Sequence, residues 1–274
     1  MQTRKKSTGS DRKTRKARGC RARDGYKFQV GTSGFMVSQQ KWTDLECLNC
    51  IEINSSFYRV PSEKVVDGWK SLPERVGFVI KASKYITHIK RLKDVREPWN
   101  VLWKSISPLG DRLRCVLFQL PPSFHLKEEN IQRIKDLKRI IPSNVRIAIE
   151  FRDPSWFVNS MYSLFRALGW CMAGTLVKKK AEEKWMGNMP DGLLLPPLTA
   201  GFSYVRIHGS KGFRGELSRA ELVKLREKLL GQRPKQSFVM FNNTFFSSRG
   251  ESCTVGGTRV QYAAVCNAVQ FSSL

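Results

Sequence analysis

Opposite charges stand at the end of an apolar run near the middle of the chain. In "RIAIEFRDPSWF" (146–157), Glu150 and Arg152 alternate with Ile149 and Phe151. Successive side chains of a β-strand point to opposite faces, so the two charged residues share one face and the apolar residues share the other. A buried charge needs an opposite charge or a ligand beside it. We therefore expect the end of this strand to carry chemistry.

The same alternation occurs in other apolar runs of the chain, and each run places polar residues near its C-terminal end. If these runs are parallel strands of one closed sheet, their ends meet at one mouth, where active sites of such barrels lie. The residues that we expect to converge there are Glu52, Asn54, Lys81, Gln119, Glu150, Arg152, Arg206, His208 and Asn242.

These residue types suggest different chemical roles within one site. His208 has the ordinary pKa to move protons near neutral pH. Glu52 and Glu150 could act as an acid/base or nucleophile pair. Arg152 and Arg206 suit bidentate capture of a phosphate or carboxylate. The alternative is that the charges pair only with one another and plug the barrel as an internal salt-bridge layer.

Other kinds of site receive little support from the sequence. Three histidines and few inward acids predict no metal site, and the absence of a Walker-type loop or a G-x-G-x-x-G fingerprint predicts no cofactor. The seven cysteines are scattered, which predicts reduced intracellular thiols. Cys47 and Cys50 in "CLNC" have metal or redox spacing without a second pair, so we expect two ordinary cysteines.

Eight β-rich runs, each followed by a polar corner and a helix-compatible segment, must position these residues. The runs are 28–34, 50–57, 77–83, 113–121, 145–152, 170–177, 202–209 and 236–243. Helical patterns follow at 126–140, 156–168, 218–230 and 258–271, and Ser62 and Ser218 stand where helix N-caps belong. This order predicts an α/β fold, a (β/α)₈ TIM-type barrel, in preference to a doubly wound open sheet.

Composition divides the chain into a tail and a body. Residues 1–25 are basic and nearly devoid of apolar side chains, which predicts a disordered tail ahead of a single barrel domain over 26–274. The net charge of +25 favours anionic partners, a small anion or nucleic acid. No apolar stretch reaches the length of a membrane span, so we expect no membrane partner and an intracellular protein of nucleus or cytoplasm.

Ordered motifs along the chain resemble the YecE-like family (domain of unknown function 72). They are "GTSGF", "EINSSFYRVPSEKVVDGW", "FVIKASKYITH", "LFQLPPSF", "IEFRDPSWF", "YVRIHG", "FRG" and "FNNT…NAVQF", between about residues 29 and 271. The resemblance implies a TIM-barrel fold and no established activity. It adds Tyr58, His88 and Trp156 to the expected substrate-binding residues, while residues 247–261 depart from the family pattern as an insertion.

Three hypotheses of function follow. The first is an enzyme, a metal-independent hydrolase or lyase, that uses Glu52, Glu150 and His208 on an anionic substrate. The second is a nucleic-acid-binding protein that uses the basic tail and body. The third is a non-catalytic ligand sensor. The fold alone decides among none of them.

Overall fold

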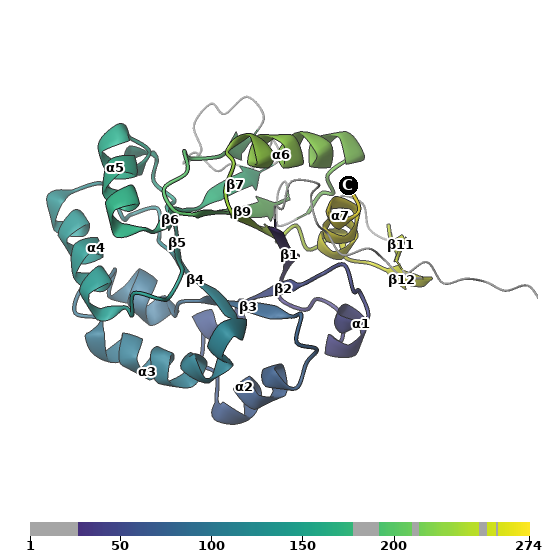
Figure 1. Cartoon of the computed structure of the whole chain (residues 1–274), viewed down its shortest axis with the longest axis horizontal. Helices are drawn as coiled ribbons and strands as arrows, with labels where there is room; N and C mark the ends of the chain where they lie inside the picture. The colour runs from purple at the N-terminus through teal and green to yellow at the C-terminus, as the bar shows by residue number, and fades with distance from the viewer. Residues whose placement is uncertain (1–26, 178–191, 210–213, 247–250, 256) are drawn as a thin grey trace, which may run out of the picture.

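The computed structural model of the chain describes residues 27–177, 192–209, 214–246, 251–255 and 257–274. Within these ranges a ten-stranded, mostly parallel sheet curls round on itself, and helices cover its outer face (Figure 1). The strands of this sheet are β1 (Lys27–Ser33), β2 (Cys50–Ile53), β3 (Gly77–Lys81), β4 (Leu113–Gln119), β5 (Ile147–Glu150), β6 (Cys171–Met172), β7 (Gly174–Val177), β8 (Leu193–Leu194), β9 (Phe202–His208) and β10 (Gln236–Phe241).

The ring closes at a strand that is broken in two. β6 pairs in parallel with β5, β7 pairs in parallel with β9, and Ala173 alone separates β6 from β7. Elsewhere in the ring β1 pairs in parallel with both β2 and β10. When β6 and β7 are counted as one strand, the eight predicted runs form a closed ring, and β8 is an antiparallel addition beside β7. The predicted TIM-type α/β fold is confirmed.

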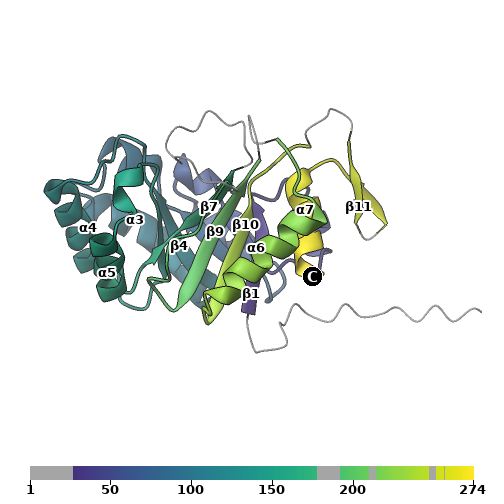
Figure 2. The same ribbon diagram turned by 90° about the horizontal axis from the view of Figure 1, so that it is seen from above.

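Helices lie outside the strands in both views (Figures 1 and 2). They are α1 (Gln39–Thr43), α2 (Glu63–Lys70), α3 (Arg96–Ile106), α4 (Glu128–Ile140), α5 (Asn159–Leu168), α6 (Arg219–Gly231) and α7 (Ala263–Ser272). Short helical turns follow three strands, at η1 (Ser55–Phe57), η2 (Tyr85–Ile89) and η4 (Pro154–Trp156), and η3 (Ser107–Arg112) joins α3 to β4. α6 begins with a complete capping box, in which Ser218 Oγ accepts from the Glu221 amide and Glu221 accepts from the Ser218 amide.

Side-chain alternation divides the barrel into two buried regions. Ile51, Ile53 and their counterparts on the other strands pack against the helices. The opposite face of the same strands fills the barrel interior with Cys50, Val79, Cys115, Leu117, Ala148, Cys171, Tyr204, Phe238 and Met240. The interior is therefore apolar over most of its length, and its polar side chains stand at the carboxyl ends of the strands.

The segment before the last helix differs from its prediction. Residues 258–271 were expected to be one helix, yet β12 (Thr258–Val260) pairs antiparallel with β11 (Cys253–Val255), and α7 begins only at Ala263. This hairpin lies on the far side of α7 from the barrel (Figures 1 and 2). The predicted insertion thus includes a hairpin that adds to the outside of the barrel.

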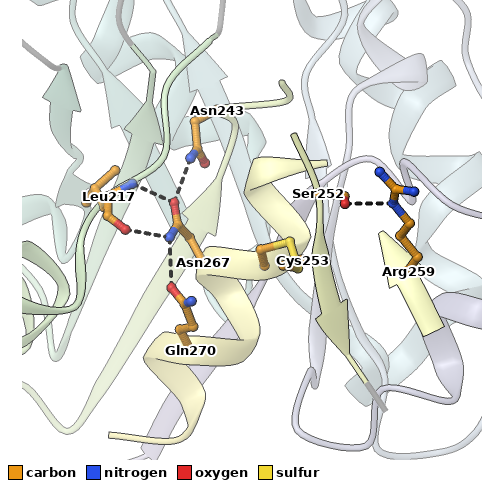
Figure 3. Close-up of a disulfide and its surroundings, with 8 residues drawn as sticks. Leu217, Asn243, Ser252, Cys253, Arg259, Asn267 and Gln270 are labelled. Atoms are coloured by element: carbon orange, nitrogen blue, oxygen red, sulfur yellow. Dashed lines mark hydrogen bonds between the residues drawn. A yellow bond between two sulfur atoms is a disulfide. The ribbon is translucent and has the colours of Figure 1, made fainter. Parts of the chain in front are cut away.

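A disulfide joins this hairpin to the barrel. Cys253 of β11 bonds to Cys266 of α7 (Figure 3). The expectation that all cysteines are reduced is therefore wrong for this pair, because sequence spacing does not reveal that hairpin and helix meet. Cys50 is a buried free thiol, and burial raises its pKa above the ordinary value.

Two expectations concern parts of the chain that the structure does not describe fully. The predicted basic tail, residues 1–25, lies outside the described residues, as do residues 247–250 of the insertion. In the ranges that are described, no helix is long and apolar enough to cross a membrane. Placement in the nucleus or cytoplasm stays a prediction.

Candidate functional site

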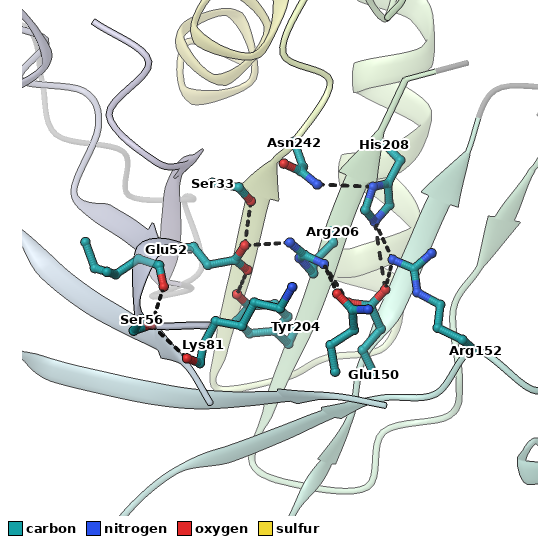
Figure 4. Close-up of polar contacts among 12 residues, drawn as sticks. Ser33, Glu52, Ser56, Lys81, Glu150, Arg152, Tyr204, Arg206, His208 and Asn242 are labelled. Carbon is teal, nitrogen blue, oxygen red and sulfur yellow. Dashed lines mark hydrogen bonds and ion pairs between the residues drawn. The ribbon is translucent and has the colours of Figure 1, made fainter. Parts of the chain in front are cut away.

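Polar side chains from several strands meet at the carboxyl end of the barrel (Figure 4). Arg206, on β9, lies at the centre and is only 2% exposed. Its Nη2 donates to Glu52 Oε1 at 2.7 Å, and its Nη1 donates to Glu150 Oε2 at 2.8 Å. Nη1 also lies 3.4 Å from Gln119 Oε1. One guanidinium therefore bridges two carboxylates that come from opposite sides of the ring.

Glu52 is held by three donors from two strands, β1 and β9. Besides Arg206, the Ser33 hydroxyl donates to Oε1 at 2.6 Å and the Tyr204 hydroxyl donates to Oε2 at 2.5 Å. Burial by itself raises the pKa of Glu52, but the Arg206 charge and these hydrogen bonds outweigh it and hold the pKa below its ordinary value. Glu52 is therefore ionised at neutral pH and acts as an acceptor.

Glu150 is ionised for the same reason. It pairs with Arg206 through Oε2 and with Arg152 Nη2 through Oε1. Burial raises its pKa, yet the Arg152 and Arg206 charges together hold it well below the ordinary value. His208 Nε2 lies 3.8 Å from the same Oε1 atom.

His208 completes the network on the side of β10. Its Nε2 lies 3.2 Å from Arg152 Nη2, and its Nδ1 lies 3.3 Å from Asn242 Nδ2. Burial lowers the pKa of His208, and the Arg152 and Arg206 charges add to that effect against the opposing influence of Glu150. Because arginine can only donate, Nε2 accepts from Arg152 and the proton of this neutral imidazole lies on Nδ1.

Lys81 ends β3 and extends toward Arg206 in Figure 4. It is 9% exposed, and within the described ranges its Nζ has neither an ion pair nor a hydrogen bond. The ammonium lies 4.0 Å from the centroid of the Phe57 ring. Ser56 holds this arrangement in place, since its hydroxyl donates to the Lys81 carbonyl at 2.7 Å. Burial, with the Arg206 charge adding, lowers the pKa of Lys81 to about 8.

Comparison with known proteins now places the chain. The model of a family described as "Protein of unknown function DUF72" matches residues 45–252, about three quarters of the sequence. The chain belongs to the DUF72 family. This confirms the resemblance seen in the motifs, and the family's description states no activity.

Relatives of this DUF72 protein share its fold. It is 27% identical over 222 residues to UPF0759 protein YunF of Bacillus subtilis (strain 168), covering 70% of this chain and 76% of that protein. A solved DUF72 family protein from Thermotoga maritima MSB8 is 25% identical with a TM-score of 0.70, covering 90% of this chain and 98% of that one. Another, from Enterococcus faecalis V583, is 19% identical with a TM-score of 0.71, covering 90% and 94%. These likenesses support the barrel fold.

His88 of the DUF72 protein flanks the same aromatic ring as Lys81. Its ring centroid lies 5.0 Å from that of Phe57. Thr87 Oγ1 donates to the Ser83 carbonyl, so the His88 Nδ1 atom, 2.9 Å from Thr87 Oγ1, is the donor in that contact. Burial, with Lys81 and other cations adding, lowers the pKa of His88 to about 4. His88 is therefore a neutral imidazole whose Nε2 carries a lone pair.

Tyr58 and Asn54 lie at the edge of this arrangement. Tyr58 packs edge to face on Phe57 and is 80% exposed, so it stands on the rim and not in the buried network. Asn54 follows β2, and its Oδ1 atom is buried with no hydrogen-bond partner within the part of the chain described. A buried amide oxygen without a protein partner is unusual in a native structure and leaves an acceptor available for a water or a ligand.

Two predicted roles require correction. Trp156 was expected to bind substrate, but it is fully buried in the outer core, stacked on Phe124 and Phe151, with Nε1 donating to the Phe124 carbonyl. The turn at η4 breaks the strand alternation and directs Trp156 outward. Arg206 was expected to capture an anion, but its two terminal nitrogens donate to the carboxylates of Glu52 and Glu150.

Sequence reasoning missed three residues of the site. Ser33 and Tyr204 have the inward parity of their strands and could have been included on that signal alone. Phe57 lies in a helical turn, for which alternation makes no prediction. In the described ranges no three His, Cys, Asp or Glu side chains gather as metal ligands do, and both site glutamates are paired with arginines.

Proposed function

We propose that this DUF72 protein is an enzyme that acts on a small anionic substrate, bearing phosphate or carboxylate, at the carboxyl end of the barrel. One observation carries the proposal, a surplus of buried positive charge. Among the residues that the structure describes, the buried cations are Lys81, Arg152 and Arg206 and the buried carboxylates are Glu52 and Glu150, which leaves 3 − 2 = +1. A bound anion would neutralise this surplus, which is costly to bury alone.

The groups that would contact the anion are those on the outer side of the network. Arg152 is 11% exposed, and its planar guanidinium matches a carboxylate or phosphate. Lys81 supplies a second positive charge with no carboxylate of its own in the described structure. Arg206 lies deeper, where it sets the positions of the two glutamates.

His208 is the residue of the site that would transfer protons. Glu52 and Glu150 are ionised at neutral pH, so neither serves as a proton donor there. His208 is neutral, and its Nε2 accepts from Arg152, which can only donate. A substrate anion that draws Arg152 away would free this lone pair to accept a proton from substrate or water. Cations that bind an anion and an imidazole that moves a proton suit a metal-independent hydrolase or lyase reaction.

The test is ligand-dependent stability of the full chain. Phosphate, pyrophosphate and small carboxylates should raise the melting temperature. At a hundredfold excess over Kd, a bound ligand adds about 2.7 kcal/mol to the free energy of unfolding. Arg152→Gln should weaken this effect at least about tenfold in Kd. Arg139→Gln is the matched control, because Arg139 is exposed on α4 and its loss removes the same charge. Equal weakening in both variants would contradict the proposal, and binding without turnover would favour a non-catalytic sensor.

Nucleic-acid binding is a second candidate, favoured by a groove beside the site. Tyr58 and Tyr85 are exposed on a groove of about 670 Å³ that Lys84 and Lys90 also line. Exposed aromatic rings with lysines beside them are typical of base-stacking surfaces, and the net charge of +25 adds to the attraction. Affinity for short single strands should then fall steeply between about 50 and 200 mM salt. It should also fall in a Tyr58→Ala, Tyr85→Ala double variant.

A further inference from the structure

Lys81 is the residue of the site whose surroundings the network does not explain. Its side chain is nine-tenths buried at the carboxyl end of a barrel strand, and in the described ranges no carboxylate pairs with it. Glu52 and Glu150, the acids that act on it electrostatically, are already bonded to Arg206 and Arg152. On its other side the ammonium meets the face of Phe57.

This setting lowers the pKa of Lys81, so a larger share of it is neutral amine than in an ordinary lysine, although the ammonium ion still predominates at neutral pH. Burial away from water and the nearby arginines destabilise the charge, and the two carboxylates only partly offset them. With a pKa of about 8, about a quarter of Lys81 is unprotonated at pH 7.5, against about 0.1% for an ordinary lysine. Desolvated lysines next to other cations are the ones that serve as nucleophiles in proteins.

We propose that Lys81 is a nucleophilic amine that forms an imine with an aldehyde or ketone carrying a carboxylate or phosphate. The inference rests on the proposed function and names the substrate class of that same site. The anionic group would lie against Arg152, and the carbonyl carbon would lie at Lys81 Nζ.

The step balances without an oxidant or reductant. The nitrogen lone pair forms a bond to the carbonyl carbon, and the C=O π electrons move to oxygen. Oxygen gains one proton and nitrogen loses one, which gives the carbinolamine. Loss of the hydroxyl as water, with the remaining nitrogen proton, leaves the imine. The group beside Lys81 that can carry these protons is the neutral imidazole of His88, while Glu52, Glu150, Arg152 and Arg206 set the electrostatic field.

The experiment traps the imine on the full wild-type chain. The probes are pyruvate and dihydroxyacetone phosphate, each incubated with the protein and sodium cyanoborohydride. Trapping should add the mass of the probe less one oxygen atom, and peptide mapping should place it on Lys81. Lys81 should be labelled more than about tenfold faster than Lys64, which is exposed on α2, because a far larger fraction of Lys81 is unprotonated. Its rate should rise through pH 8.

Matched anions without a carbonyl separate this inference from the proposed function. Lactate and glycerol 3-phosphate should slow the labelling of Lys81 and raise the melting temperature. If these anions stabilise the chain and Lys81 stays unlabelled, the imine is refuted and anion binding stands. If labels spread over surface lysines according to exposure, the imine is likewise refuted. If neither stabilisation nor labelling occurs with any probe, both proposals fail. Lys81→Arg should abolish the specific label, whereas Lys64→Arg should leave it intact.

Discussion

Replacing Lys81 by methionine should make this DUF72 protein more stable at neutral pH. The reason is that the buried ammonium costs free energy that no ion pair in the described structure offsets. The difference between the ordinary pKa of 10.5 and the pKa of about 8 corresponds to about 3 kcal/mol. The cation–π contact with Phe57 offsets about 1 kcal/mol of it. Methionine has similar length and fills the same space, so the net gain should be about 2 kcal/mol.

The stability advantage of the methionine variant should depend on pH. Between pH 8 and 10.5 the unfolded chain holds the Lys81 proton more strongly than the folded chain does, so wild-type stability rises with pH across that window. Below pH 8 both states carry the charge and the cost is fully present. The advantage of the methionine variant should therefore be largest at pH 7 and shrink to within about 1 kcal/mol of zero at pH 10.

Urea denaturation of both proteins at pH 7, 8.5 and 10 measures this difference. Lys64→Met is the matched control, because it removes one positive charge from an exposed position on α2 and should change stability by less than about 0.5 kcal/mol. A methionine variant at position 81 that is less stable than wild type at pH 7, or whose advantage does not change with pH, would refute the reasoning.

Arg206→Ala should destabilise the fold by about 3–5 kcal/mol, because Glu52 and Glu150 are left buried without their shared cation; a loss under about 1 kcal/mol in urea denaturation would contradict this. Stability should also fall in acid, since both carboxyls have a pKa below the ordinary 4.5, so their contribution is present above pH 4.5 and lost as pH drops through the folded pKa values. Urea midpoints that stay level from pH 5 to about pH 2 would argue against it. Cys253→Ser should cost about 3 kcal/mol for the loop closed with Cys266, and reductant should lower the wild-type melting temperature to that of the variant. A wild-type melting temperature indifferent to reductant would show the bond to be open in solution.

Much of the site could be predicted because strand periodicity is a local property. A residue's parity within its run decides whether it faces the barrel interior or the helices, and that holds whatever the neighbouring strands are. Glu52, Glu150, Arg206 and His208 were placed on the inner face in this way, and the structure brings them into one network. Trp156 was added by the family resemblance and not by parity, and it lies within the helical turn η4, for which strand alternation makes no prediction.

The pairing of charges needed the tertiary structure. Glu52 and Arg206 are 154 residues apart and meet only because the ring closes through β10 and β1. The sequence shows how many cations and carboxylates the inner face holds. It does not show that Arg206 bonds both acids while Lys81 bonds no carboxylate of the described residues. Likewise, Cys253 and Cys266 are 13 residues apart, and only the docking of the hairpin on α7 brings them together.

By itself the sequence determined the fold class, the inner and outer faces of the strands, and the end of the barrel at which chemistry would lie. These follow from side-chain periodicity and the order of elements, which neighbouring residues specify. The structure decided which charge is neutralised and which is left over, hence the lowered pKa of Lys81 and the state of His208. Those properties depend on distances and burial across the ring, and electrostatic energy is set by such distances and not by position along the chain.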